Sequence, residues 1–318
     1  MMLAELVRIA HEYGSDIKQI QGAGGNFSIK QGTELTIKSS GVLLKNVTQK
    51  RGWTEVDSKR FLEGIPKIHD RYPTKHEESC YIHAVGDSQI DTNVPRPSME
   101  LGFHAVIPHR WVLHTHSLAG ILFGLQNSGL PDHIGPIRMI SIPPAIPGLH
   151  LTWMIQQRLQ DPFDYDVPCF WLLKNHGVVW SGNQLDMLEK LSCNFEIYFR
   201  AVFGIDRFQL PTWLEKDPAV LGFGLEAGSV ILGDEPTYPD YVVFFPRGGP
   251  KQEDPFKIRL PRVPKEDEKD IFCELVFAQT VVSTIAQKLG VESALPVGLR
   301  KRIASLEIEK LRLLQMRW

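Results

Sequence analysis

The chain has 318 residues, of which 43% are hydrophobic and 23% are charged. These fractions are average for a globular protein, and 26 glycines and 22 prolines are too few for a collagen-like or disordered chain. The basic and acidic side chains number 35 and 37, a net charge of −2, and there is no basic face of the kind that nucleic-acid binders carry. The length favours one large domain or two.

Cysteine usage and apolar runs indicate the compartment. The four cysteines are widely spaced and form no CxxC pair, which favours reduced thiols. No apolar run reaches the roughly 18 residues that a membrane span needs, and the first residues lack a signal-peptide pattern. We therefore expect a cytoplasmic protein that binds neither a membrane nor nucleic acid.

The first elements follow from hydrophobic periodicity. Apolar residues at helical spacing predict a helix that stops at Gly14. A Gly-rich turn then leads into a hairpin with strands over 27–30 and 35–40, joined at Gln31 and Gly32. Residues 60–98 are polar and contain several prolines, which predicts an irregular segment.

The rest of the chain alternates strand-like and helix-like runs, which indicates an α/β protein with helices packed on a central sheet. The expected elements are a helix over 99–105, a strand from 111, a helix over 117–129, two strands about a Gly177 turn within 168–183, a helix over 184–203, a strand over 239–246, a loop over 247–255, and helices over 267–290 and 296–316.

The most specific local feature is His114-Thr115-His116, directly after an apolar run. In an extended segment these two imidazoles point to one face and form a natural pair of metal ligands; a surface pair without a metal is the alternative. His176 is the best third ligand, because Gly177 lets the backbone turn beside it, although an ordinary turn histidine has the same pattern. Three imidazoles with an open position are typical of catalytic zinc, and other divalent metals also accept imidazole.

Other histidines have weaker patterns. Glu100 and His104 would share a helix face at a spacing of four, so that His104 could be a fourth ligand and Glu100 a ligand or a base. An ordinary exposed pair is the alternative. His69, His76 and His83 are spaced seven residues apart, and a proline lies between the first two. We interpret them as surface residues.

The run GAGGNFS offers consecutive backbone N–H groups to an anion. Its spacing fits neither a P-loop nor a dinucleotide fingerprint, and it precedes a strand rather than a helix. A plain hairpin turn is the alternative to an anion site.

Taken in order, these pieces resemble the class II aldolase/adducin family, the zinc-dependent sugar-phosphate aldolases and their relatives. The resemblance covers roughly residues 2–210 and is carried by GAGGNFSIK, IKSSGVLL, RPSMELGFH, VLHTHS and NHGVVWSG. Five motifs in the family's order are far more specific than any one of them. The resemblance implies an α/β/α sandwich with a mostly antiparallel central sheet, assembled as a homotetramer with active sites at subunit interfaces.

The resemblance also implies roles for individual residues. His114, His116 and His176 would hold Zn²⁺, and Glu100 would be the catalytic acid/base. The positions that match the phosphate-binding residues of the aldolases are Gly25, Asn26, Ser40, Gly41 and Ser98.

Three positions depart from the family's pattern. Ala23 and Met99 stand where the aldolases often carry hydroxyl side chains that contact phosphate, and Ser117 stands where Pro commonly follows the histidine pair. The first two departures weaken the phosphate assignment, and none of the three concerns the metal ligands.

We expect residues 1–210 to form the metal-binding catalytic domain and residues 211–318 to form a C-terminal helical extension of unknown function that packs on it. The insert at 66–97 and the run PTYPDYVVFF look like the aldolase part of the long rhamnulose-phosphate aldolase-like proteins, in which a dehydrogenase follows. Because this chain ends without a GxGxxG motif, we expect no redox activity.

The implied activity is that of a lyase: reversible aldol cleavage of a ketose or ketose 1-phosphate through a zinc-stabilised enediolate. The partner would be a small sugar or sugar phosphate. The same family scaffold supports 4-epimerisation of pentulose phosphates and dehydration of a sugar phosphate, so these reactions are the first alternative. A non-catalytic interaction domain, as in adducin, is the second.

Overall fold

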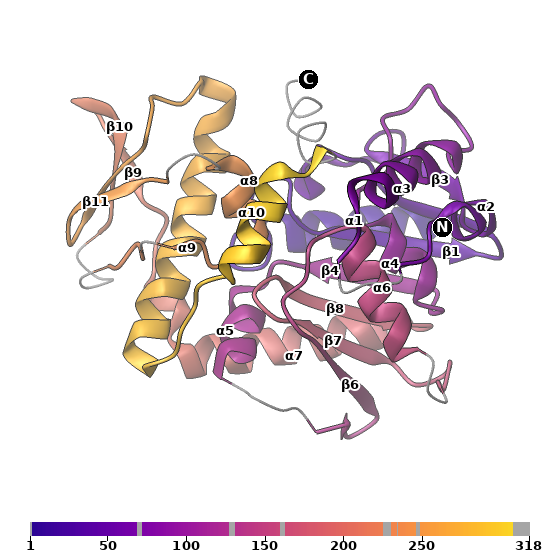
Figure 1. Ribbon diagram of the computed structural model, residues 1–318. Helices are drawn as coiled ribbons and strands as arrows, with labels where there is room; N and C mark the ends of the chain where they lie inside the picture. The colour runs from indigo at the N-terminus through magenta and orange to yellow at the C-terminus, as the bar shows by residue number, and fades with distance from the viewer. Residues whose placement is uncertain are drawn as a thin grey trace.

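The computed structural model describes residues 2–68, 72–126, 131–159, 163–224, 230–233, 235–245 and 249–307. Within these ranges the chain forms an eight-stranded sheet with helices packed against it and a C-terminal part at one side (Figure 1). The strands of the sheet are β1 (Asn26–Gln31), β2 (Glu34–Lys38), β3 (Trp53–Asp57), β4 (Trp111–Thr115), β5 (His133–Ile134), β6 (Ile137–Ile142), β7 (Cys169–Leu173) and β8 (Gly177–Gly182).

The strand order is β3-β2-β1-β4-β8-β7-β6-β5. Neighbouring strands pair antiparallel except β6 and β7, which run parallel. The central sheet is therefore mostly antiparallel, as the resemblance implies. The helices associated with it are α1 (Met2–Gly14), α2 (Ser58–Gly64), α3 (Lys75–Asp87), α4 (Leu101–Val106), α5 (Leu118–Gln126), α6 (Leu149–Arg158) and α7 (Leu185–Phe203).

Both faces of the sheet are covered, because alternate side chains of the central strands enter different cores. Leu113 of β4 packs in one cluster with residues of α1, α5 and α7. Its neighbour Val112 packs in another cluster with residues of α4 and α6. Successive side chains of a strand point to opposite faces, and a strand buried on both faces reads as a continuous apolar run. This arrangement confirms the α/β/α sandwich.

The C-terminal part contains helices and a small sheet. Its helices are α8 (Pro239–Phe244), α9 (Lys269–Leu289) and α10 (Val297–Ser305), and its strands are β9 (Thr212–Leu214), β10 (Asp217–Gly222), β11 (Lys251–Asp254) and β12 (Lys257–Arg259). Short 3₁₀ helices lie at Leu44–Asn46, Ile205–Arg207 and Glu266–Glu268. The small sheet has the order β11-β12-β10-β9, and the sequence patterns did not predict it.

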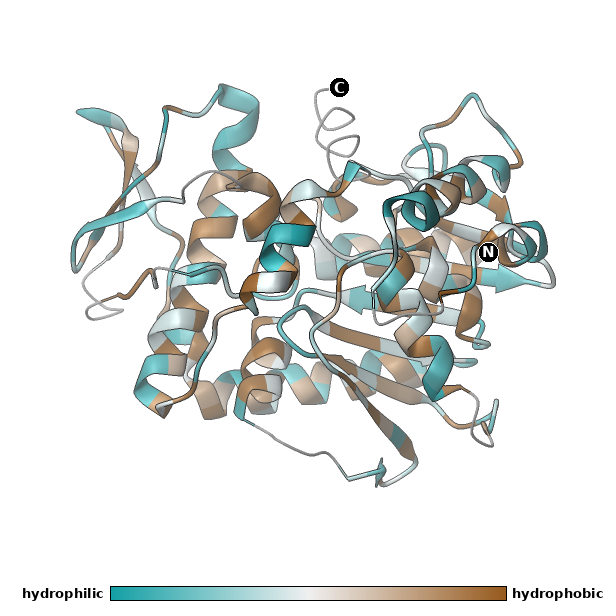
Figure 2. Cartoon of the chain, in the orientation of Figure 1, coloured by the Kyte–Doolittle hydropathy of each residue, from teal (hydrophilic) through white to brown (hydrophobic). Residues whose placement is uncertain are grey.

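Helix α9 joins the C-terminal part to the sandwich. Its side chains from 272 to 286 are buried, and the helix is hydrophobic along most of its length (Figure 2). One core cluster contains apolar side chains of α5, α8 and α9 together. The C-terminal part therefore packs on the sandwich, while a domain division at residue 210 stays a prediction. No helix among the described residues combines the length and apolarity that a membrane crossing needs.

Two sequence expectations about segments rich in proline are wrong. Residues 60–98 are not irregular throughout, because α2 enters this range and α3 lies within it. Thr74 begins α3 with a capping box to Glu77, so the preceding Pro73 marks where the helix starts instead of breaking it. The run 239–246 was expected to be a strand and contains α8.

The strand prediction over 239–246 failed because the first residues of α8 are buried on all sides. Pro239 suits the first position of a helix, since its φ is already helical and no N–H is needed there. Residues 239–243 are all buried, so that the run shows no helical periodicity. The expected loop over 247–255 contains β11, and of the expected helix over 296–316 the structure describes α10, while residues 308–316 lie outside the described residues.

Candidate metal centre

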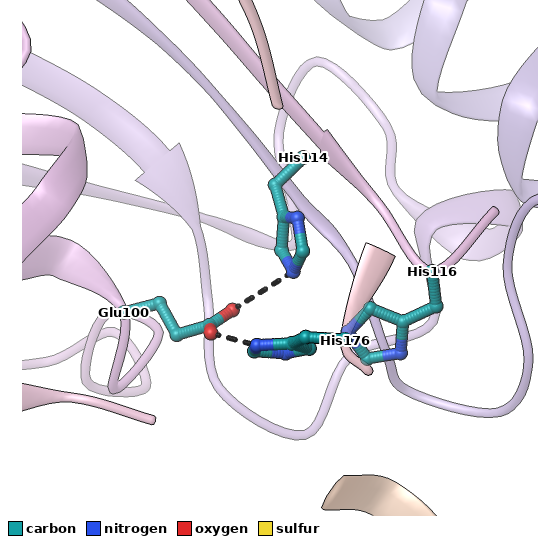
Figure 3. A group of neighbouring side chains, drawn as sticks. All are labelled: Glu100, His114, His116 and His176. Atoms are coloured by element: carbon teal, nitrogen blue, oxygen red, sulfur yellow. Dashed lines mark ion pairs between the residues drawn. The ribbon is translucent and has the colours of Figure 1, made fainter. Parts of the chain in front are cut away.

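The residues that the sequence associates with a metal lie together at one end of the central strands. His114 is the penultimate residue of β4, opposite Asn26 of β1, and His116 follows the end of the strand. His176 lies in the turn between β7 and β8, and β8 pairs with β4. Figure 3 shows the three imidazoles and Glu100, the residue before α4, converging on one point.

The geometry of this cluster is regular. The ring centroids of the three histidines form a nearly equilateral triangle with sides of 4.9, 5.0 and 5.0 Å. The Glu100 oxygens lie 3.4 Å from Nε2 of His114 and 3.4 Å from Nε2 of His176. One ligand atom from each of the four residues lies within 4.8 Å of the others, and all four side chains are buried.

The donor set fits a divalent cation. Neither Nε2 of His114 nor Oε1 of Glu100 has a hydrogen-bond partner among the described residues, although both atoms are buried. An unsatisfied buried polar atom costs about 1–3 kcal/mol, more for a charged group. A bound cation would satisfy both atoms, and imidazole and carboxylate are ligands that zinc and related metals accept. The residues present therefore fit a metal ion of unspecified identity.

The turn that presents His176 has an unusual backbone. Asn175 has a φ of 59°, in the left-handed region that Asn tolerates better than most residues. Gly177 has a φ of 143°, and a Cβ there would lie 2.1 Å from the carbonyl oxygen of Thr115. Gly177 thus allows the turn to lie directly against the backbone between the other two histidines.

We expect Gly177→Ala to lower the free energy of unfolding of the metal-free protein by about 2–4 kcal/mol, because neither backbone can move aside cheaply. Gly32→Ala is the matched control, since Gly32 also has a positive φ but has no atom within 4 Å of the added Cβ; it is expected to lose about 1–2 kcal/mol. Urea unfolding in the presence of a chelator measures both. If both variants lost the same free energy of unfolding, the contact between residue 177 and the Thr115 backbone would not explain the loss in Gly177→Ala.

A chain of hydrogen bonds holds Glu100. The amide nitrogen of Asn26 donates to Oε2 of Glu100 at 2.7 Å and to Oγ of Ser98 at 3.1 Å. The amide oxygen of Asn26 contacts Nε2 of His104, and Nδ1 of His104 lies 2.7 Å from Oγ of Ser28. The carboxylate is therefore positioned from β1 by one hydrogen bond from Asn26, which also donates to Ser98.

His104 does not join the cluster, so the expectation of a fourth histidine ligand is wrong. Both of its ring nitrogens are engaged by Asn26 and Ser28. Burial holds the pKa of His104 well below 6.5, with further lowering from His114 and Lys30. A neutral ring donates to the Asn26 oxygen and accepts from the Ser28 hydroxyl, and it acts as a support for Glu100 through Asn26.

A small cavity beside the cluster contains the residues that the sequence associates with phosphate. Its lining is Ala23, Gly25, Asn26, Lys38, Ser40, Gly41, Ser98, Met99, Glu100, His116, Pro147, His176 and Asp240. Lys38 donates through Nζ to the carbonyl oxygens of Ala23 and Val42, each at 2.8 Å, which ties down the Gly-rich turn. The other lysine near this turn, Lys45, is not part of the lining and pairs with Glu274 of α9 at 3.0 Å.

Asp240 is the residue of this site that sequence reasoning missed. It belongs to α8 in the C-terminal part, is 3% exposed, and lines the cavity. Its Oδ2 lies 3.4 Å from Nδ1 of His116. The only signal in the sequence is an acidic residue within an apolar run, and that run was interpreted as a strand of the extension.

Other sequence candidates lie elsewhere. His76 and His83 are exposed on α3, as expected for surface histidines, and His69 lies outside the described residues. Ser117 accepts the N–H of Gly120 at 2.9 Å and donates to Glu196 of α7. The departure at Ser117 therefore supports the start of α5 and leaves the metal cluster unaffected.

Comparisons with known proteins give the family. Residues 3–201 match the family described as the class II aldolase and adducin N-terminal domain. A Bacillus subtilis protein named as an uncharacterized oxidoreductase, YuxG, is 27% identical over 190 residues, 56% of this chain. The chain spans only about a quarter (26%) of the length of that curated relative.

Solved structures with a similar arrangement include the N-terminal class II aldolase domain of a conserved Thermoplasma acidophilum protein. It is 23% identical, with a TM-score of 0.49 over 63% of this chain and 92% of that one. L-fuculose-1-phosphate aldolase of Thermus thermophilus is 16% identical, with a TM-score of 0.41 over 64% and 95%. The family match covers more than half of the sequence, and the chain therefore belongs to the class II aldolase and adducin family.

Proposed function

We propose that the protein is a metal-dependent lyase that reversibly cleaves a ketose or ketose 1-phosphate by retro-aldol chemistry. The observation that carries the proposal is the buried cluster of three imidazoles and Glu100, which opens on a cavity lined by the Gly-rich turn. We propose His114, His116 and His176 as the ligands of a divalent metal, with zinc as the first choice. The homotetramer implied by the resemblance stays a prediction.

Glu100 would move the proton in this reaction. Cleavage breaks the bond between C3 and C4 of the ketose, and its electron pair stays on the three-carbon fragment as an enediolate, while the C4 hydroxyl loses its proton as C4 becomes the aldehyde carbon. Glu100 takes up the proton from the C4 hydroxyl and delivers it to C3, and in the aldol direction the same carboxylate removes the C3 proton and returns it to the aldehyde oxygen. When bound, a divalent metal polarises the substrate carbonyl and offsets the negative charge that develops.

The remaining cavity residues would orient the substrate. Asn26 holds Glu100 through a 2.7 Å hydrogen bond, so that its carboxylate keeps one orientation during the proton transfer. Ser40, Gly41 and Ser98 line the cavity and are proposed to bind the polar or phosphorylated end of the substrate. The hydroxyl of Ser40 is buried and has no hydrogen-bond partner among the described residues, so that it can serve a ligand.

Product analysis of the metal-loaded protein tests this proposal. A panel of ketoses and their 1-phosphates is incubated with the protein and the products are identified by chromatography and NMR. Release of dihydroxyacetone or its phosphate with an aldehyde supports the lyase. An isomeric pentulose phosphate would make the protein an epimerase, a dehydrated sugar phosphate would make it a dehydratase, and no turnover of any substrate would favour the non-catalytic alternative.

The preference for a phosphorylated substrate over the free ketose is expected to be reduced by the departures at Ala23 and Met99. Met99 and Ala23 line the cavity without a hydroxyl donor, and the Asp240 carboxylate lies in the same lining, where it repels a phosphate. One hydrogen bond to a charged group contributes about 1.5–3 kcal/mol, which corresponds to roughly 10–150-fold in affinity. We expect wild-type kcat/KM for a ketose 1-phosphate to exceed that for the free ketose by less than about 10⁴-fold, and Met99→Ser to raise this ratio at least tenfold.

Met99→Ala is the matched control, because it makes the same truncation without the hydroxyl and should leave the ratio unchanged. Steady-state kinetics with both substrates gives the ratio for each protein. A wild-type preference above about 10⁴-fold that Met99→Ser does not alter would show that the cavity binds phosphate fully without a donor at this position.

A further inference from the structure

The carboxylate of Asp240 lies behind the ring of His116. Nδ1 of His116 and Oδ2 of Asp240 are 3.4 Å apart, and the side chains are 2% and 4% exposed. Figure 3 shows one ring nitrogen of His116 turned toward the other imidazoles and one turned away from them. Since Nδ1 faces Asp240, Nε2 is the nitrogen that faces the cluster.

The hydrogen bonds assign the tautomer of His116. Without a metal ion, the backbone N–H of Gly25 donates to Nε2 at 3.4 Å, which requires on Nε2 the lone pair that an ion would take when bound. In a neutral imidazole the proton is then on Nδ1, which faces the carboxylate. His114 follows the same rule: its Nδ1 lies 3.0 Å from the carbonyl oxygen of Val178, which can only accept, and its Nε2 faces Glu100.

The group facing Nδ1 is a neutral carbonyl for His114 and a carboxylate for His116, and this difference affects how strongly each ring binds a metal. A carboxylate behind a ligating imidazole fixes the ring orientation and makes the other nitrogen more basic than a neutral carbonyl does. Loss of such a partner typically weakens metal binding by about 10–100-fold. His116 thus has a charged acceptor 3.4 Å from its Nδ1, and this acceptor belongs to a residue outside the family match at 3–201.

The C-terminal part is built to hold Asp240 in this place. The hydroxyl of Tyr238 donates to the carbonyl oxygen of Leu275 in α9 at 3.0 Å. Thr237 donates to the Gln279 side chain of α9 through its backbone N–H at 3.0 Å and through its hydroxyl at 2.9 Å. The carbonyl oxygen of Thr237 in turn accepts from Asn175, the residue before His176. The segment that carries Asp240 is therefore fixed to the metal site and to α9 at once.

The Gly-rich turn leaves room for this pair. A Cβ on Gly24 would lie 2.5 Å from Nδ1 of His116 and 2.8 Å from Oδ2 of Asp240. Real Cβ atoms do not approach other atoms so closely, so a side chain at Gly24 would push the ring and the carboxylate apart. The absence of a side chain at this position lets the backbone pack against the pair.

We propose that Asp240 is a positioning residue of the metal centre: its carboxylate faces Nδ1 of His116 across 3.4 Å, favours the proton at that nitrogen by its charge and so presents Nε2 to the ion. By this means the C-terminal part completes a centre whose ligands all come from the sandwich. The inference rests on the proposed metal site, but it does not depend on which reaction the site catalyses.

Zinc affinity of the full-length protein, measured by competition with a chromophoric chelator in the absence of substrate, tests the proposal. We expect Asp240→Ala to bind zinc about 10–100-fold more weakly than wild type. Asp240→Asn, which keeps the shape and one acceptor oxygen, should recover part of that loss. Thr284→Val is the matched control, because it removes the buried hydrogen bonds between Thr284 of α9 and the backbone of Ile231 and leaves Asp240 and its contacts intact; its affinity should stay within about threefold of wild type.

The visible spectrum of the Co²⁺-loaded proteins separates positioning from direct ligation. We expect the bands to shift in Asp240→Ala without the large change in intensity that a new coordination number brings. A change in coordination number would make Asp240 a ligand and overturn the positioning role. So would wild-type zinc affinity in Asp240→Ala, an equal loss in Thr284→Val, or no recovery in Asp240→Asn. Tight zinc binding without cleavage of any ketose would refute the proposed function alone, and no metal binding by wild type would refute both.

Discussion

Glu100→Gln is expected to lower kcat by about 10²–10⁴-fold, the usual contribution of a positioned acid/base. The substitution keeps the shape of the side chain and an oxygen that can accept from Asn26, so the fold should be retained. The three imidazoles remain, so metal content should stay near one ion per chain. Steady-state kinetics and elemental analysis of the same preparation measure the two quantities together.

Glu55→Gln is the matched control for this experiment, since Glu55 is an exposed carboxylate on β3. It should turn over like wild type. If Glu100→Gln retained turnover within a few-fold of wild type, the proton would have to be moved by another group. If Glu100→Gln lost the metal as well, the carboxylate would be required as a ligand, and its effect on kcat would no longer report on proton transfer.

His176→Ala is expected to abolish stoichiometric metal binding. It removes one corner of a triangle whose ring centroids are 4.9–5.0 Å apart, so a bound ion would lose one of its three imidazole ligands. Elemental analysis after dialysis against a weak chelator should give close to one ion per chain in wild type and close to none in the variant. Thermal unfolding should lose its dependence on added zinc.

His83→Ala provides the control, because His83 is exposed on α3 and its removal leaves the cluster intact. The same zinc content in His176→Ala and His83→Ala would end the assignment of the three-histidine set. Since His176 lies beside the strained turn at Asn175, circular dichroism of both variants is needed to show that the sheet is retained.

The local sequence could predict those parts of the centre that depend only on the spacing and type of neighbouring residues. His114 and His116 are two residues apart on an extended segment, which places them on one face, and Gly177 beside His176 signals a tight backbone turn. The short apolar runs of β4 and β8, bounded by turn residues, predict strands. These inferences need only the residues within a few positions of the feature.

The parts that could not be predicted depend on contacts between distant segments. His104 is four residues from Glu100, yet it bonds to Asn26 and Ser28 of β1, because the pairing of β1 with β4 sets which polar groups meet it. Asp240 lies far from His116 in sequence, and no local pattern relates the two. Residues 239–243 of α8 are all buried, which removes the periodicity by which a helix is recognised.

The long-range contacts of the C-terminal part have a consequence for the nascent chain. The N–H of Gly22 donates at 2.7 Å to Glu274 of α9, 252 residues later, so the turn that closes the metal site is secured only after α9 has been synthesised. At about 5–20 residues per second, the roughly 100 residues between His176 and Glu274 take about 5–20 s to translate. During that interval the three histidines already exist on the ribosome without the complete α9 against the site. The last contact that secures the Gly-rich turn therefore forms only after the whole of the sandwich has been translated.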